Sequence, residues 1–119
     1  MFLSKTNKYA ISSIIKSLKN KAMGYDNINT KVVKTSIDVI SNPLSHIINL
    51  CFSQGVVPEE LKISLIVPIY KSGNNHHPTN YRPISLLPVL SKIFERSLYN
   101  RIINFLNKKM LFLLNNLVF

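Results

Sequence analysis

The sequence predicts an α+β fold dominated by helices, with a short β-hairpin between the third helix and the last. Two observations lead to this prediction. Apolar residues recur at helical spacing in four stretches of the chain. Two short runs rich in β-branched residues, 63–70 and 81–87, flank a polar loop. The length of 119 residues suits one small domain or a piece of a larger one.

Three helices are expected before the hairpin. The first runs from about residue 8 to 19 and combines an apolar stripe with a basic face. The second is expected to begin with Thr30 as its N-cap and to reach about residue 40. Pro43 suits a first helical position, so the third helix should start there and end at Gly55 in a left-handed conformation.

The hairpin is expected to protrude as a ribbon. Pro68 and Pro83 cannot donate to a ladder, so each strand should lie at an edge. Lys71 and Arg82 stand at the two mouths of the loop, where pairing of the strands would bring their charges together. A paired lysine and arginine at the base of an exposed loop can grip a phosphate-rich ligand. After the hairpin, Pro88 opens a long helix predicted to reach about residue 107.

Charge favours a polyanionic partner. Lysine and arginine outnumber acids 15 to 5, for a formal charge of +10. Nucleic acid is the first candidate and an anionic membrane surface the second. The N-terminus does not look like a signal peptide, and the apolar C-terminal stretch is too short to span a bilayer. The single cysteine, Cys51, suits a buried reduced thiol. We therefore expect an intracellular protein, in the cytoplasm or nucleus, that is not secreted.

The residue inventory favours binding over catalysis. The five acids are scattered, whereas metal-dependent phosphoryl transfer usually needs two or three converging carboxylates. His76 and His77 are adjacent loop residues without zinc-site spacing. No phosphate-binding glycine loop or serine-nucleophile motif occurs. We expect no catalytic residue and no metal site in this chain.

Five pieces of the chain resemble, in family order, the N-terminal part of reverse transcriptases of non-LTR (LINE-like) retrotransposons. They are K-A-M-G-Y-D-N-I at 21–28, the helix and G-V-V-P-E-E-L-K segment at 47–62, I-V-P-I-Y-K-S-G at 66–73, N-Y-R-P-I-S-L-L at 80–87 and L-S-K-I-F-E-R-S-L at 90–98. The piece with N-Y-R-P-I-S-L-L is the most specific. Leu61 stands in place of the usual tryptophan and Tyr25 where proline is common.

The resemblance implies a right-hand polymerase of which this chain would be the fingers. Residues 8–111 would form the fingers region of a partial reverse transcriptase domain, and 112–119 an apolar tail, with palm and thumb missing. Lys71 and Arg82 would face the triphosphate of the incoming nucleotide. The implied partners are an RNA or DNA template–primer and a deoxynucleotide, and the intact family implies Mg²⁺. The palm aspartates that would hold it are not in this sequence, so we expect no activity from the chain alone.

Several alternatives stay open. For Lys71, contact with a ligand and simple solvation are equally favoured interpretations. Tyr81 is a candidate for stacking on a base, although packing against the long helix is the favoured interpretation. Lys92 and Arg96 are candidates for nucleic-acid contact, with a solvated helix face as the favoured interpretation. At the level of function, a small basic nucleic-acid-binding protein without catalysis is the alternative, and interfacial membrane association is a weaker one.

Overall fold

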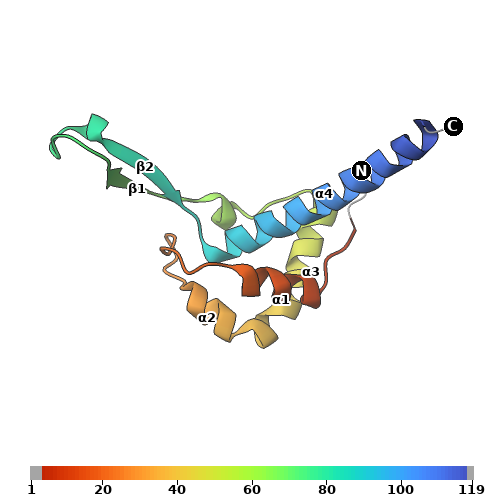
Figure 1. The fold of residues 1–119 in the computed structure, drawn as a ribbon. Helices are drawn as coiled ribbons and strands as arrows, with labels where there is room; N and C mark the ends of the chain where they lie inside the picture. Colours follow the sequence, from red (N-terminus) through yellow and green to blue (C-terminus); the bar gives the residue numbers. More distant parts are fainter. Residues whose placement is uncertain (1–3, 118–119) are drawn as a thin grey trace.

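The computed structural model describes residues 4–117 and has the predicted order of elements, three helices followed by a ribbon and a fourth helix (Figure 1). The α-helices in this range are α1 (Lys8–Ser17), α2 (Thr30–Thr35), α3 (Ile37–Gln54) and α4 (Val89–Leu117). The other elements in this range are the strands β1 (Leu65–Tyr70) and β2 (Tyr81–Leu86) and the 3₁₀ turns η1 (Glu59–Lys62) and η2 (Pro78–Asn80). The α+β prediction, with helices dominant, is confirmed.

The molecule is elongated because two elements leave its helical body. The β1–β2 hairpin projects on one side, and the C-terminal half of α4 projects on the other (Figure 1). The radius of gyration is 18.5 Å and the extents are 64 × 40 × 25 Å, whereas a compact domain of 100 residues has a radius of about 13 Å. The helical body consists of α1, α2, α3 and the first turns of α4.

The core lies where α1 packs against both α3 and α4. Phe52 of α3 and Phe94 of α4 meet edge to face, with ring centroids 5.7 Å apart. The buried apolar residues of α1 are spaced as one face of a helix requires; they are Ile11, Ile14 and Ile15. The apolar stripes predicted from the sequence therefore do form the core. Cys51, expected to be buried, is only half-buried at its edge.

The boundary between the second and third helices was predicted wrongly. The break falls at Ser36, whose backbone leaves the helical region at φ −95° and ψ 14°, and Pro43 lies inside α3. A proline inside a helix removes one i→i−4 hydrogen bond, here the one to the carbonyl of Val39. Because Pro43 is exposed, water can satisfy that carbonyl. The sequence signal of a helix start at Pro43 was therefore overridden by the packing of α3 as one continuous helix.

The helix ends follow local capping chemistry. The N-cap of α2 is Asn29 rather than Thr30, and its side chain accepts a hydrogen bond from the backbone N–H of Lys31 at 2.9 Å. Thr30 itself is buried. Gly55 ends α3 in the left-handed region at φ 67°, as predicted. α1 ends at Ser17, two residues before the predicted end.

The last helix is longer than predicted. α4 continues past Asn107 to Leu117 because no glycine or proline interrupts it and its residues are tolerated in helices. The predicted tail at 112–119 is thus helical over 112–117, and residues 118 and 119 lie outside the described range. Its last turns expose a row of apolar side chains: Met110, Leu111, Phe112, Leu113 and Leu114. Among residues 4–117, no helix has the length and apolar character required to cross a bilayer.

The hairpin tolerates two prolines because of its register. The backbone N–H of Lys71 donates to the carbonyl of Asn80 at 2.9 Å. Hydrogen-bonded and non-hydrogen-bonded pairs alternate along an antiparallel ladder. Pro68 and Pro83 lie opposite each other three pairs further along, at a non-hydrogen-bonded position. Neither proline therefore removes a bond from the ladder, and the predicted protruding ribbon is confirmed.

The loop after α1 is pressed against the junction between β2 and α4. Gly24 is buried, and a Cβ at this position would lie 2.6 Å from the nitrogen of Pro88 and 2.9 Å from the carbonyl carbon of Leu87. Real Cβ atoms essentially never approach backbone atoms so closely. Only glycine therefore allows the two backbones to meet here.

Two hydrogen bonds hold the segment that leads into the hairpin. The hydroxyl of Tyr25 donates to the carbonyl of Glu60 at 2.8 Å. The hydroxyl of Ser91 in α4 donates to the carbonyl of Leu61, also at 2.8 Å. The turn η1 is thus tied to the Gly24 loop and to α4 at the base of the hairpin.

Replacing Gly24 with alanine should destabilise the fold. The added methyl group must push apart two backbone segments, and overpacking of this kind typically costs about 1–3 kcal/mol. Chemical denaturation of the purified chain measures the loss. The neighbouring Met23→Ala substitution is the control, because Met23 is 40% exposed and should change stability much less. Equal effects of the two substitutions would contradict the proposed close approach.

Candidate nucleotide and nucleic-acid interface

Lys71 and Arg82 lie on the same face of the hairpin. Arg82 pairs with Ile69 in the register, and Lys71 follows opposite Asn80. Side chains alternate between faces along a strand, so Lys71 and Arg82 are diagonal neighbours on one side. Diagonal pairs lie about 7–8 Å apart, within reach of long side chains. The register therefore puts the two cations on one face at the base of the loop, as the predicted pairing of the strands requires.

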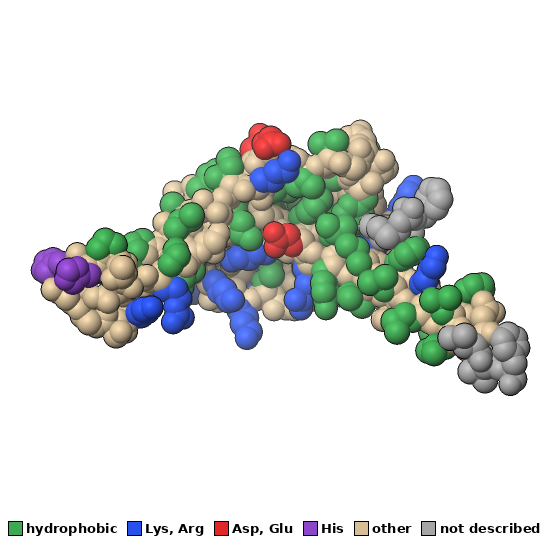
Figure 2. Space-filling view, turned by 90° about the horizontal axis from the view of Figure 1, so that it is seen from above, with side chains coloured by type: hydrophobic (Ala, Val, Ile, Leu, Met, Phe, Trp, Pro, Cys, Tyr) green, Lys and Arg blue, Asp and Glu red, His purple; other side chains and the backbone are tan. Residues whose placement is uncertain are grey.

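The hairpin cations have no acidic neighbour in the sequence. No aspartate or glutamate occurs between Glu60 and Glu95. Both Lys71 and Arg82 are exposed, and within residues 4–117 the ion pair that forms joins Lys62 to Glu59, at 3.0 Å. Lys71 and Arg82 therefore present uncompensated positive charge to solvent. Figure 2 shows lysine and arginine side chains along one edge of the molecule, from the hairpin onto the helical body.

Tyr81 belongs to the opposite face of the hairpin. It pairs with Tyr70, and the two rings meet edge to face with centroids 5.8 Å apart. The Tyr81 hydroxyl donates to the carbonyl of Asn75 at 2.6 Å. The expectation that Tyr81 packs against the long helix is therefore wrong, because the hairpin projects away from that helix (Figure 1). Its stacking on a base stays a prediction, separate from the face of Lys71 and Arg82.

Asn80 organises the loop of the hairpin. Its side-chain amide donates to the carbonyl of Asn74 at 2.7 Å. Gly73 adopts the left-handed conformation at φ 85° beside the Asn80 side chain. The backbone N–H of His76 donates to the Asn74 side chain at 2.9 Å, and His76 is exposed. The Asn80 side chain therefore supports the loop, and His76 and His77 are both exposed.

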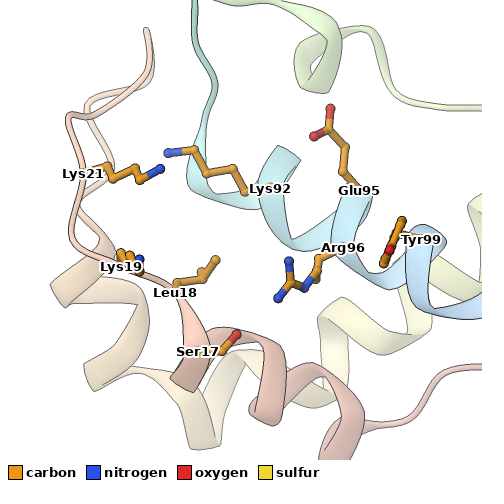
Figure 3. A pocket seen from close by; sticks show the side chains of 8 residues that line it. All are labelled: Ser17, Leu18, Lys19, Lys21, Lys92, Glu95, Arg96 and Tyr99. Atoms are coloured by element: carbon orange, nitrogen blue, oxygen red, sulfur yellow. The ribbon is translucent and has the colours of Figure 1, made fainter.

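A second basic surface lies on the helical body, in a groove between the end of α1 and the first turns of α4 (Figure 3). We call it the α1–α4 groove, and its volume is about 770 Å³. Its lining residues come from the end of α1, the loop after it and α4; they are Ser17, Leu18, Lys19, Lys21, Lys92, Glu95, Arg96 and Tyr99. Cavities that hold ligands commonly have volumes of this order.

The helix α4 supplies one wall of the groove. Lys92 and Arg96 are four residues apart and therefore lie on one face of the helix. In Figure 3, Lys92 points toward Lys21 of the loop and Arg96 points toward the end of α1. Glu95 also lines the groove, with its side chain directed away from these two cations. Lys92 is half-buried, whereas Arg96 is exposed. The two candidate nucleic-acid contacts thus share one concave surface.

No model of a protein family matches the sequence. Curated relatives from Drosophila melanogaster do match it. The chain is 34% identical to the probable RNA-directed DNA polymerase from transposon X-element and 36% identical to the RNA-directed DNA polymerase from mobile element jockey. It is 32% identical to the probable RNA-directed DNA polymerase from transposon BS. These matches cover 76%, 70% and 77% of the chain.

The chain is homologous to a segment of non-LTR retrotransposon reverse transcriptases. It spans about a tenth of the length of these relatives, with 10%, 9% and 11% covered. The resemblance inferred from five ordered motifs is therefore confirmed. The piece K-A-M-G-Y-D-N-I also has a structural explanation, because its Gly24 allows the backbone of this loop to lie close to Pro88.

Lys19 and Lys21, which line the α1–α4 groove, were not among the candidate site residues predicted from the sequence. The first helix was predicted to reach about residue 19, but α1 ends at Ser17 and Lys19 lies in the loop that follows. Lys21 opens the piece K-A-M-G-Y-D-N-I, three residues before Gly24. The position of Lys21 in that piece was the signal by which the sequence could have indicated it as a candidate site residue. What the sequence did not show is that Gly24 docks this loop beside α4.

Proposed function

We propose that this chain is the fingers portion of a non-LTR reverse transcriptase and that its hairpin holds the triphosphate of an incoming nucleotide. The observation that carries the proposal is the β1–β2 register, which puts Lys71 and Arg82 on one exposed face. The homologous polymerases support it, because their names specify RNA-directed synthesis of DNA. An RNA or DNA template–primer is the second proposed partner.

The two cations suit a triphosphate for complementary reasons. The guanidinium of Arg82 offers a planar fork that can bind two phosphate oxygens, and Lys71 supplies a compact point charge. Neither cation is held by an acid within the described range. The hairpin that carries them is braced at its base by η1, which Tyr25 and Ser91 hold in place. A clamp of this kind stabilises charge that develops on a transferring phosphoryl group.

The chemical step is proposed to require residues beyond this segment. Residues 4–117 bring together no group of three or more His, Cys, Asp or Glu side chains. They therefore do not fit the Mg²⁺ site that the polymerase family implies. The proposed role of this segment is to bind and orient the nucleotide and to contact the template strand.

Replacing Lys71 and Arg82 together with alanine should weaken nucleotide binding by at least about tenfold, because both charge-assisted contacts to phosphate are lost. Titration of the full chain with a deoxynucleoside triphosphate at low ionic strength measures the change. Salt should weaken the wild-type interaction, since both cations are exposed.

The matched control replaces Lys31 and Lys108, two exposed lysines on α2 and α4, and removes the same charge. The control should keep most of the affinity. If both double variants weaken binding equally, the effect belongs to total charge and the hairpin proposal fails.

A primer-extension assay tests the requirement for further residues. With an RNA template, an annealed DNA primer, deoxynucleotides and Mg²⁺, the chain alone should extend the primer no more than a heat-denatured sample does. The reason is that phosphoryl transfer of this kind needs converging carboxylates. Template-dependent synthesis by the purified chain would contradict the proposal.

A further inference from the structure

The β1–β2 hairpin has two open edges. It is a sheet of two strands that projects from the helical body, and neither edge pairs with a further strand among residues 4–117 (Figure 1). β1 is exposed at every residue except the half-buried Val67. The free backbone N–H and C=O groups of such an edge are a template for pairing with another chain, which soluble proteins have to prevent.

The composition of β1 makes this edge especially prone to pairing. Its sequence L-I-V-P-I-Y carries no charge and no glycine, and four of its six residues are Val, Ile or Tyr, which favour strands. Ile66 is 66% exposed and Tyr70 is 49% exposed. Segments of about six residues with this composition stack into intermolecular sheets when no proline interrupts them. Pro68 is the residue of β1 that breaks this pattern.

The register of the hairpin fixes the direction in which each backbone N–H points. A residue at a hydrogen-bonded position of an antiparallel ladder turns its N–H toward the partner strand, and a residue at a non-hydrogen-bonded position turns it outward. Pro68 and Pro83 lie opposite each other at a non-hydrogen-bonded position, so the nitrogen of each faces the free edge of its own strand. Because proline has no N–H, the donors are missing from the outer edges and not from the ladder inside the hairpin.

Each edge therefore lacks a donor at its centre. Three positions of each strand turn outward; they are Ile66, Pro68 and Tyr70 on β1 and Tyr81, Pro83 and Ser85 on β2. The N–H of Tyr81 is also occupied, because it donates to the carbonyl of Pro78. An incoming strand needs a partner at every second residue of the edge. At the middle of either edge it would meet a proline ring instead.

We propose that Pro68 and Pro83 close both edges of the hairpin to strand addition by a second copy of this chain, so that ligands reach the ribbon through its faces. The face that carries Lys71 and Arg82 is thereby kept open. The inference rests on the register of the strands and on the two prolines. It holds whether or not the hairpin binds a nucleotide.

The double variant Pro68→Thr/Pro83→Thr tests the proposal, because it restores an N–H at both edges and adds no apolar surface. Light scattering of the purified full chain over a concentration series measures association. The variant should associate at a concentration at least about tenfold below that of wild type, since both edges can now accept a strand. The infrared spectrum of the associated variant should gain the band of intermolecular β-sheet.

The matched control is the double variant Ile66→Val/Ser85→Thr. It places β-branched residues at outward positions of the same two edges, where an N–H is already present. It should associate at the same concentration as wild type, because no donor is added. Association of this control equal to that of the proline variant, or no change in the proline variant, overturns the proposal.

Two further measurements separate strand addition from unfolding and from contacts elsewhere. The proline variant should unfold at no lower denaturant concentration than wild type, because threonine suits a strand. Hydrogen exchange should slow at the outward amides of Ile66, Tyr70 and Ser85 once the variant associates. Association that accompanies a loss of stability, or slower exchange confined to the exposed end of α4, overturns the proposal. The dilute variant keeps Lys71 and Arg82, so the nucleotide titration and this test can fail independently.

Discussion

The close approach of Gly24 to the backbone of Leu87 and Pro88 is the contact on which the arrangement of both basic surfaces depends. On one side of this contact, the loop after α1 carries Lys21 to the edge of α4. On the other side, the chain leaves β2 and enters α4, so the hairpin and the helix share one anchored junction. A side chain at position 24 would separate these elements. The contact thus couples the fold to the position of the charges.

The cations are positioned in two different ways, by strand pairing in the hairpin and by helix and loop packing in the groove. In the hairpin, the alternation of a β-ladder selects which side chains share a face, and it joins Lys71 with Arg82 while Tyr81 faces the other way. In the groove, helical periodicity aligns Lys92 with Arg96, and loop docking supplies the opposite wall. The hairpin suits a compact ligand with concentrated charge. The groove suits an extended strand. The proposed contacts with a nucleotide and with a template would use one surface each.

Much of the fold was predictable because the local signals agreed with the tertiary structure. Gly55 ends α3 in a left-handed conformation, as predicted. The two predicted strands pair, which brings the two ends of the hairpin loop together. Prediction failed where packing overrode a local signal, as at Pro43 inside α3. It also missed Lys21, because the wall of the groove is made by segments far apart in the sequence that meet through Gly24. The end of α4 exposes the apolar side chains of residues 110–114, which is the character of an interaction surface.

The most direct test of this account is a comparison of two NMR titrations of the isotope-labelled chain, one with a deoxynucleoside triphosphate and one with a single-stranded oligonucleotide. We expect the nucleotide to shift the amide signals around Lys71 and Arg82, and the oligonucleotide to shift those around Lys21, Lys92 and Arg96. Two separate footprints would support two binding surfaces with distinct ligands. One shared footprint, or shifts spread evenly over every lysine and arginine, would contradict the central claim.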